Sequence, residues 1–327
     1  MSESSSPLAF RVIILMPVYQ DWECASAVCQ TLDKQFRKLP HVESRLLLVD
    51  DGSPDGADGW IPFKRRALRQ LDTLRLRRNV GHQRAICAGV CYIYQHMSCD
   101  AVLIMDADGE DRAEDAVRLV ELAVSKPATV FFAERRKRFE GVVFRIGYNF
   151  FRALHRVLTG IPVRVGNFSI VPHRLLGRLT CMPELWNHYA GAVFKSNVNF
   201  ECIPMDRGVR VTGRSRMNLV SLVVHGISGI ATFSDTVATR ILMSTVAGLI
   251  ILLIALIAIF GIGIWTQLVI PGWAMYTTGL AMVLLVQLLG IAFSLVFSLI
   301  SNRTTMSFVP VRDYTVFVEN LENLPDP

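Results

Sequence analysis

Charged residues are absent from two long stretches near the C-terminus of this 327-residue chain. Residues 241–264 and 274–300 contain no Asp, Glu, Lys or Arg, and each is longer than the roughly 20 residues that cross a hydrocarbon layer. The first stretch holds fifteen Leu, Ile, Val and Phe side chains, whose insertion into a bilayer contributes about −0.3 to −0.6 kcal/mol each. The sequence therefore predicts transmembrane helices over residues 240–264 and 274–300, and a buried helix of a soluble protein is the alternative.

Lysine and arginine are absent from the short connection between these stretches, residues 265–273, whereas Arg240, Arg303 and Arg312 flank their other ends. Cytoplasmic loops of membrane proteins carry an excess of Lys and Arg. We therefore expect both termini and the large N-terminal region in the cytoplasm, with the chain spanning the inner (plasma) membrane twice. The polar, Ser-rich residues 1–7 lack an apolar stretch, so we expect no cleavable signal peptide.

Cysteine pairs with metal-ligand spacing are also lacking, which argues against a zinc module. Seven cysteines, an odd number, in a cytoplasmic region predict reduced and mostly buried thiols. The net charge is +6, but no nucleic-acid-binding module accompanies it, so we expect no nucleic acid partner. The basic run at residues 135–138 instead suits anionic lipid headgroups or a phosphorylated lipid.

Apolar strands alternate with helical segments in the N-terminal half, which is typical of an α/β sheet. The pattern predicts strands over residues 11–16, 44–49, 74–76, 101–105 and 129–133, a helix over residues 21–36, and a second helix that ends near residue 97. Ligands of open α/β sheets lie at the carboxyl ends of the strands. We therefore expect a domain over residues 11–216 whose binding site is built from the loops that follow these strands.

Two carboxylates follow the most apolar of these strands directly. Asp106 and Asp108 come after residues 101–105, and residues two apart in extended backbone project to the same face. Carboxylates placed in this way suit one hard cation, Mg²⁺ or Mn²⁺, which keeps coordination positions open for phosphate oxygens. A solvated turn is the alternative for this pattern.

A second acidic pair, Asp50 and Asp51, ends the strand over residues 44–49. Gly52 and Pro54 follow it and predict a turn, which presents both carboxylates at the same edge of the sheet. Two acidic turns at one edge of an α/β sheet indicate a site that handles a nucleotide diphosphate.

Four short motifs share the order and spacing of family 2 glycosyltransferases, which the chain resembles from about residue 12 to residue 300. They are Pro17-Val18-Tyr19-Gln20, Asp50-Asp51-Gly52-Ser53, Asn79-Val80-Gly81 with Ala88-Gly89, and Met105-Asp106-Ala107-Asp108. Further along, the chain resembles the polyprenyl-phosphate glycosyltransferase branch, which includes dolichyl-phosphate mannose synthase and the bacterial enzymes that charge undecaprenyl phosphate with glucose. The features that carry this are Gly166-Asn167-Phe168, Arg207-Gly208, Gly213-Arg214-Ser215-Arg216 and the two spans. The resemblance implies an α/β fold, namely a GT-A type nucleotide-diphospho-sugar transferase domain (Rossmann-like) followed by two transmembrane helices.

The resemblance also implies roles for individual residues. Those implied to bind the nucleotide sugar are Pro17, Val18, Tyr19, Asp50, Asp51, Gly81, Arg84 and Asp106. Asp106 would contact the ribose and Asp108 the metal-bound diphosphate, both as part of the catalytic site, with Glu110 as a further oxygen ligand of the metal. The arginines that we expect to bind phosphate groups during catalysis, because guanidinium donors match phosphate oxygens, are Arg135, Arg136 and Arg214.

The chain departs from the family pattern at three places. Relatives often carry Gln where Glu110 stands, His-Pro-Pro-Glu where residues 111–114 read Asp-Arg-Ala-Glu, and Gly-Asp-Phe where this chain has Asn167. The Asn removes a carboxylate that would serve as a base or a sugar ligand. A polyprenyl phosphate is already an anion near neutral pH, so it needs a general base less than a sugar hydroxyl does. In-line attack by this phosphate would invert the anomeric carbon of the donor.

Other segments are expected at the membrane surface or outside the folded domain. Residues 142–158 mix aromatic and Arg side chains, which predicts an interfacial helix, and residues 217–235 predict a juxtamembrane amphipathic helix. We expect polar tails over residues 1–10 and 301–327, the second in the cytoplasm. The resemblance further implies a homo-oligomer, and specifically a tetramer.

Two other functions compete with polyprenyl-phosphate glycosylation. A processive polysaccharide synthase would share the nucleotide domain, but the chain lacks a Gln-x-x-Arg-Trp motif and further spans. A catalytically inactive membrane scaffold that binds nucleotide sugars is the other alternative; the retained Asp51, Asp106 and Asp108 argue against it, and Asn167 argues for it. The sequence leaves the sugar open, and only the bacterial character of the two-span region favours UDP over GDP.

Overall fold

A computed structural model of the chain describes residues 9–57, 60–135, 142–161, 165–211, 219–266, 272–302 and 308–323. The chain divides into two compact units. The first, which we call the sheet unit, is drawn from residues 1–141, 164–232 and 308–327, and the second, which we call the hairpin unit, from residues 142–163 and 233–307.

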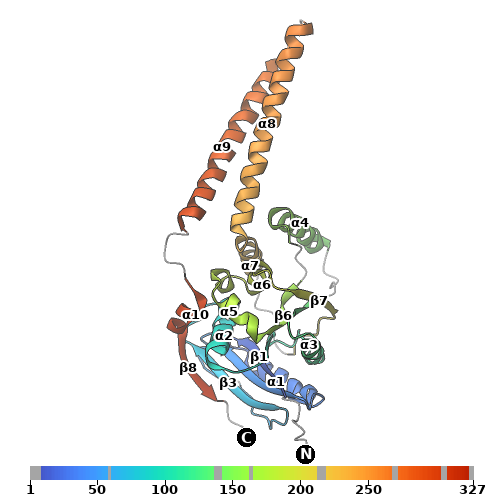
Figure 1. Ribbon diagram of the computed structural model, residues 1–327, viewed down its shortest axis with the longest axis vertical. Coiled ribbons are helices and arrows are strands. Elements are labelled where there is room, and N and C mark those ends of the chain that lie inside the picture. Colours follow the sequence, from blue (N-terminus) through green and yellow to red (C-terminus); the bar gives the residue numbers. More distant parts are fainter. Residues whose placement is uncertain are drawn as a thin grey trace, which may run out of the picture. The chain divides into compact units, whose positions relative to one another are not determined.

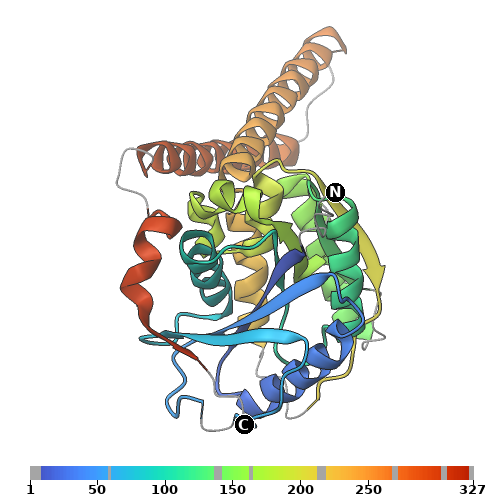
Figure 2. The ribbon, with the colours of Figure 1, turned by 60° about the horizontal axis from the view of Figure 1, so that its bottom comes forward.

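The sheet unit is built on one eight-stranded mixed sheet with the strand order β7-β5-β6-β4-β1-β2-β3-β8. The strands are β1 (Phe10–Val18), β2 (Val42–Asp50), β3 (Leu68–Leu76), β4 (Ala101–Ile104), β5 (Val130–Arg135), β6 (Val165–Pro172), β7 (Phe200–Met205) and β8 (Val318–Asn323). Strands β3, β2, β1 and β4 are parallel, β6 runs antiparallel between β4 and β5, and β8 is antiparallel to β3. Figures 1 and 2 show this twisted sheet with helices on both of its faces.

Each face of the sheet carries its own apolar core. Helices α1 (Trp22–Phe36) and α3 (Ala113–Ser125) cover one face, while α2 (His82–His96), α5 (His173–Thr180) and α6 (Tyr189–Lys195) cover the other. The central strands are apolar on both faces because both are buried in this way. Gly89 of α2 has a packing role, since a Cβ there would lie 2.4 Å from a methyl carbon of Leu15 and 2.8 Å from one of Val49.

The mixed α/β fold expected from the sequence is confirmed, but several elements differ from the expected ranges. Strand β3 is nine residues long. Only residues 74–76 were expected to form a strand, because polar and charged side chains separate the leucines along β3. Strands β6, β7 and β8 were not predicted. Residues 308–323, within the segment expected as a tail, instead form helix α10 (Pro310–Asp313), a 3-10 turn (Tyr314–Phe317) and β8, which extends the sheet beside β3.

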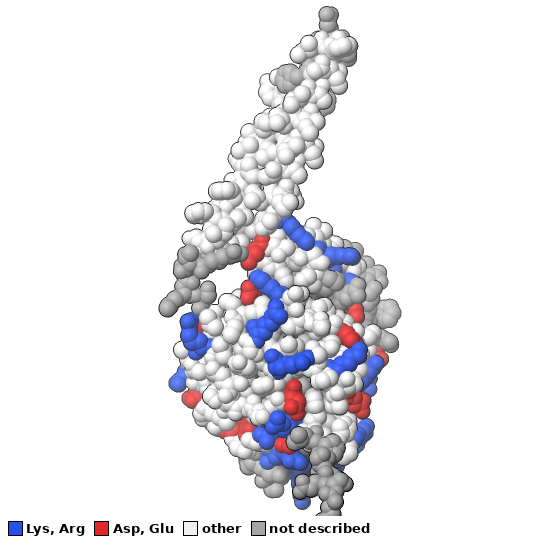
Figure 3. All heavy atoms as spheres, in the orientation of Figure 1, with Lys and Arg blue, Asp and Glu red and all other residues white. Residues whose placement is uncertain are grey.

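The hairpin unit consists of α4 (Val142–Thr159), α8 (Ser234–Thr266) and α9 (Gly272–Asn302). Within α8 and α9, residues 234–258 and 275–301 are long and apolar enough to span a membrane, with mean hydropathies of 2.8 and 2.6. In Figure 3 the described parts of these two helices carry charged atoms only near one end. Helix α4 coincides with the expected interfacial helix, and α7 (Leu219–Ala231) lies in the region expected as juxtamembrane.

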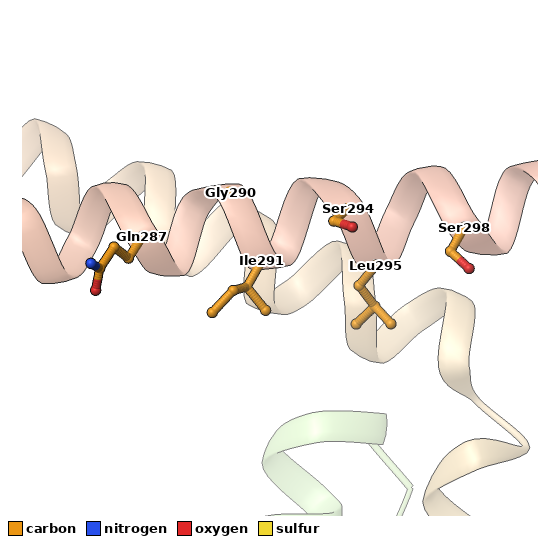
Figure 4. Close-up of a pocket in the computed structure, with 6 residues that line it drawn as sticks. All are labelled: Gln287, Gly290, Ile291, Ser294, Leu295 and Ser298. Atoms are coloured by element: carbon orange, nitrogen blue, oxygen red, sulfur yellow. The ribbon is translucent and has the colours of Figure 1, made fainter.

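One side of α9 carries polar and small residues among its large apolar ones. A shallow groove runs along it, and Figure 4 shows its lining residues Gln287, Gly290, Ile291, Ser294, Leu295 and Ser298. Polar side chains inside membrane spans usually face another helix or a cavity, because acyl chains offer them no hydrogen-bond partner. This side of α9 therefore favours contact with protein over contact with lipid tails.

Candidate functional site

The carboxyl ends of β1, β2 and β4 meet at one edge of the sheet, because β1 lies between the other two and all three are parallel. Val18 pairs with Asp50, and Leu15 pairs with Ile104, so the loops that follow these strands begin side by side. Strand β6 is antiparallel to β4, and its first residues therefore bring Asn167 to the same edge. This edge collects most of the residues that the sequence predicted for the site.

Asp51 joins two loops at this edge. Its carboxylate accepts hydrogen bonds from the backbone N–H groups of Val80 (2.7 Å) and Gly81 (2.9 Å). Burial raises the pKa of Asp51 to about 6, although the two N–H groups oppose this by stabilising the charged form. Burial also raises the pKa of the neighbouring Asp50, whose carboxylate accepts a hydrogen bond from the backbone N–H of Ser53 at 2.9 Å.

Gly52 allows these two loops to come together. Its φ of +70° is unfavourable for other residues, and a Cβ at this position would lie 2.4 Å from the carbonyl carbon of Arg78. We expect Gly52→Ala to lower the free energy of unfolding by about 1 to 2 kcal/mol more than Gly56→Ala does. Gly56 is the matched control because it has a similar φ of +57°, but its Cβ would meet only the flexible end of the Arg75 side chain at 3.3 Å. Thermal unfolding measures the difference, and equal losses in the two variants would contradict the proposed backbone clash.

A histidine that the sequence analysis did not single out lies between Asp106 and Asn167. His82 Nε2 is 3.1 Å from Asp106 Oδ1 and 3.0 Å from Asn167 Nδ2. Partial loss of hydration lowers the pKa of His82, but the charge of Asp106 and their hydrogen bond outweigh it, so that its pKa lies above the ordinary value. The carboxylate of Asp106 thus favours the protonated form of the imidazole.

The orientation of the Asn167 amide follows from a chain of hydrogen bonds. The backbone N–H of Tyr189 donates to Gln83 Oε1 at 2.8 Å, and Gln83 Nε2 donates to Asn167 Oδ1 at 3.1 Å. Because a backbone N–H can only donate, both side-chain amides are oriented by it. Asn167 therefore turns its NH₂ group toward His82, and the chain offers a donor where the resemblance leads one to expect a carboxylate.

The turn after Asp106 carries two further acids, each paired with an arginine. Arg210 Nη1 lies 3.5 Å from Asp108 Oδ2, and the same guanidinium pairs with Asp21 at the start of α1. Glu110 pairs with Arg207, and its backbone N–H donates to Asp108 Oδ1 at 3.0 Å. Both arginines come from the loop after β7, about 100 residues further along the chain.

We call residues 206–211, which carry these arginines, the strap. Its backbone follows the acidic turn, because Gly208 N donates to the carbonyl of Glu110 at 2.8 Å and Val211 N donates to that of Asp108 at 3.1 Å. A Cβ on Gly208 would lie 2.6 Å from the carbonyl oxygen of Gly109, so a larger residue would separate the two segments. The strap thus holds two guanidinium groups directly over the acidic turn.

The acidic turn has the donor chemistry of a site for Mg²⁺ or Mn²⁺. Among the described residues, no group of three or more His, Cys, Asp and Glu side chains is arranged to hold a metal ion. Mg²⁺ bound with a nucleotide, however, usually uses one or two protein carboxylates and completes its shell with phosphate oxygens and water. Asp108 and Glu110 supply hard oxygens in one turn, and the guanidinium groups paired with them show that this turn attracts cations.

The structure brings together most, but not all, of the residues predicted for the site. Pro17, Val18, Tyr19, Asp50, Asp51, Gly81, Asp106, Asp108 and Glu110 lie on the loops and strand ends described above. Arg84 instead places its guanidinium carbon 5.7 Å from the centre of the Trp186 ring. The side chain of Arg135, and the whole of Arg136 and Arg214, lie outside the described residues, so their roles stay predictions.

Parallel strands that deliver acidic turns to one edge, with a basic strap over them, define a transferase domain of the GT-A type. The profile of glycosyl transferase family 2 matches residues 13–180, just over half of the chain. The chain belongs to this family.

Several known proteins are similar to the chain over most of its length. The uncharacterized glycosyltransferase YkoT of Bacillus subtilis (strain 168) is 26% identical over 260 residues, which cover 78% of this chain and 75% of YkoT. The bactoprenol glucosyl transferase of Shigella phage SfV is 25% identical over 236 residues, 71% of this chain and 75% of that protein. A crystal structure of Mycobacterium tuberculosis glucosyl-3-phosphoglycerate synthase with Mn²⁺, UDP and glucosyl-3-phosphoglycerate matches with a TM-score of 0.47 and 14% identity, covering 70% of this chain and 80% of that one.

Proposed function

We propose that the protein transfers a sugar, with inversion, from a nucleotide diphosphate sugar to a polyprenyl phosphate at the cytoplasmic face of the membrane. The observation that carries this proposal is the meeting of the Asp51 turn, Asp106 and the strap-covered acidic turn at one sheet edge, in a chain with two candidate membrane spans. The similarity to a protein named bactoprenol glucosyl transferase supports the polyprenyl acceptor. We favour a UDP-sugar as the donor.

Different residues of the sheet edge bind the base, the metal ion and the phosphates of the donor. Pro17, Val18 and Tyr19 line the pocket for the nucleotide base. The carboxylate of Asp51 accepts hydrogen bonds from this base. Asp108 and Glu110 would hold Mg²⁺ or Mn²⁺, which neutralises charge on the departing diphosphate when it is bound. The strap arginines are placed to exchange their carboxylate partners for phosphate oxygens, which accept the same paired N–H donors.

The acceptor phosphate needs no carboxylate base in this site. A polyprenyl phosphate is an anion near neutral pH and already a nucleophile, so the loss of a carboxylate at Asn167 is compatible with catalysis. The NH₂ group of Asn167, which is oriented through Gln83, offers a hydrogen-bond donor to an anion at this point. The site therefore works by positioning and by stabilising negative charge.

The path of the chain supports a cytoplasmic location of the sheet unit with two crossings. The chain leaves the sheet unit after Thr232 and returns to it at Phe308, so the intervening spans must begin and end on one side of the membrane. Arg240 and Arg312 flank those ends, as the positive-inside rule requires for cytoplasmic flanks. The tetramer stays a prediction, and the polar side of α9 supports contact between spans of different copies.

A transfer assay tests the function with the purified full-length protein. Undecaprenyl phosphate is offered with a panel of UDP- and GDP-sugars, with and without Mn²⁺. We expect one UDP-sugar to give a glycosylated lipid phosphate only when the cation is present. Elongation of a glycan without lipid phosphate would favour a processive synthase, and cation-dependent donor binding without turnover would favour an inactive scaffold.

The pKa of Asp51 predicts how donor affinity depends on pH. Protonation removes the negative charge that the donor contacts, so we expect the affinity for UDP-glucose, whose diphosphate stays ionised, to fall as the pH drops below about 6. Because folding raises the pKa of Asp51 from 3.8, protonation of Asp51 stabilises the folded state as the pH falls through this range. The expected loss of donor affinity is therefore not caused by unfolding linked to Asp51. Calorimetric titrations between about pH 5 and about pH 8 measure the effect. The Asp51→Asn variant should bind weakly and show no such step; an equal step in this variant would assign the pH dependence to another group.

A further inference from the structure

After α9 the chain returns to the sheet unit and packs against the loop that Asp51 binds. We call residues 77–81 the donor loop and residues 308–323 the C-terminal segment. Strand β8 of this segment pairs with β3, and Leu76 at the end of β3 lies opposite Val318. The next residue, Arg77, donates its backbone N–H to the carbonyl of Phe317 at 2.8 Å. The C-terminal segment therefore contacts the donor loop from its first residue.

The side chains of Arg78 and Trp186 add contacts with the Phe317 ring to this backbone hydrogen bond. The guanidinium carbon of Arg78 in the donor loop lies 5.9 Å from the centre of the Phe317 ring. That ring is 4.9 Å from Trp186, which in turn lies 5.7 Å from the guanidinium carbon of Arg84. Guanidinium groups over aromatic faces are attracted by the ring quadrupole. Arg84 thus belongs to the packing of the C-terminal segment, which explains why its side chain is not at the carboxylates.

The segment is also tied to the helix that follows the donor loop. Tyr314 is 1% exposed, and its hydroxyl donates to Gln95 Oε1 at 2.8 Å and lies 3.2 Å from His96 Nε2. Gln95 Nε2 also donates to the carbonyl of Val311 at 3.0 Å. These contacts join the segment to the last turn of α2, whose first turn carries His82 and Gln83 of the site.

The donor loop therefore lies between two supports. On one side Asp51 binds the N–H groups of Val80 and Gly81, and on the other side the C-terminal segment binds Arg77 and Arg78. We propose that the C-terminal segment, with Phe317 as its main positioning residue, holds the donor loop in the conformation that binds the nucleotide diphosphate. This inference rests on the proposed function, and it makes residues after the membrane spans part of the donor site.

Three single variants of the full-length protein test this proposal. Phe317→Ala removes the ring beneath Arg78, and Phe317→Tyr keeps it. Val316→Ala is the matched control, because Val316 lies in the same turn but is 69% exposed. Each variant is measured for the affinity of UDP with Mn²⁺, for KM and kcat with the donor, for thermal stability, and for hydrogen exchange of the peptide that covers the donor loop.

We expect Phe317→Ala to weaken UDP binding and raise the donor KM by roughly three- to tenfold, the equilibrium effect of losing such a contact, with little change in kcat. Its donor loop should exchange amide hydrogens faster while α1 exchanges as before, and the Tyr and Val316 variants should behave as the unchanged protein does. A lower melting temperature with unchanged UDP affinity and unchanged exchange in the donor loop would overturn the proposal. If the unchanged protein bound no nucleotide, the proposed function would fail, while the exchange of the donor loop would still report whether Phe317 holds it.

Discussion

Replacing Asp108 by Asn is expected to lower kcat for sugar transfer by at least about 10³-fold while the protein stays folded. The amide keeps an oxygen that can accept the hydrogen bond from the backbone N–H of Glu110. In the unchanged protein this nitrogen lies 3.0 Å from Asp108 Oδ1. The turn therefore keeps its shape, and Arg210 keeps its second partner, Asp21. What is lost is the negative charge that would hold the cation beside the diphosphate. Steady-state transfer to undecaprenyl phosphate, together with a thermal unfolding curve, measures both parts of this prediction.

Glu121→Gln is the control for the loss of one negative charge, because Glu121 is an exposed acid on the outer side of α3. It should leave the transfer rate unchanged. If Asp108→Asn retained its turnover, Asp108 would have no place in the mechanism, and the cation would have to be held elsewhere. If the Asn variant failed to fold, the acidic turn would instead be a structural element of the sheet edge.

The sequence predicted the sheet edge well because the signal there is local. An apolar strand that ends in a carboxylate combines two features within about ten residues, and Asp51 and Asp106 both follow this pattern. The family resemblance, now confirmed by the match over residues 13–180, rests on the same local motifs. The two long apolar stretches were equally visible, because a membrane span needs roughly 20 consecutive, predominantly apolar residues.

Partners that are distant in the sequence could not be predicted in this way. Arg210 pairs with Asp21 and Asp108, and nothing near Arg210 in the sequence indicates which acids it meets. The role of His82 depends on Asn167, some 85 residues away, and on a sheet in which β6 runs antiparallel beside β4. Strand β8 follows the second candidate membrane span and has two glutamates but only two apolar residues, so its sequence is typical of a polar tail and its pairing with β3 could not be predicted.

Arg210→Gln is expected to change metal affinity and turnover in opposite directions. In the structure the Arg210 guanidinium lies 3.5 Å from Asp108 Oδ2 and pairs with Asp21, so it competes with a divalent cation for the same carboxylate. Removing this charge should lower the Mn²⁺ concentration that gives half-maximal donor binding by roughly tenfold, which is about 1.4 kcal/mol. The same variant should lose about 10²-fold in kcat, since one charged donor to the departing diphosphate is gone.

This pairing of effects separates the role of Arg210 from general charge effects. Arg118→Gln, at an exposed arginine on α3, removes the same charge outside the acidic turn and the strap, and should change neither quantity. Titration of Mn²⁺ against UDP binding gives the first effect, and transfer at saturating Mn²⁺ gives the second. An unchanged Mn²⁺ requirement would mean that the Arg210 guanidinium does not compete with the cation for Asp108. An unchanged kcat would mean that Arg210 of the strap does not bind the phosphates of the donor. If both effects occur, the strap exchanges its contacts between carboxylates and phosphates during each turnover.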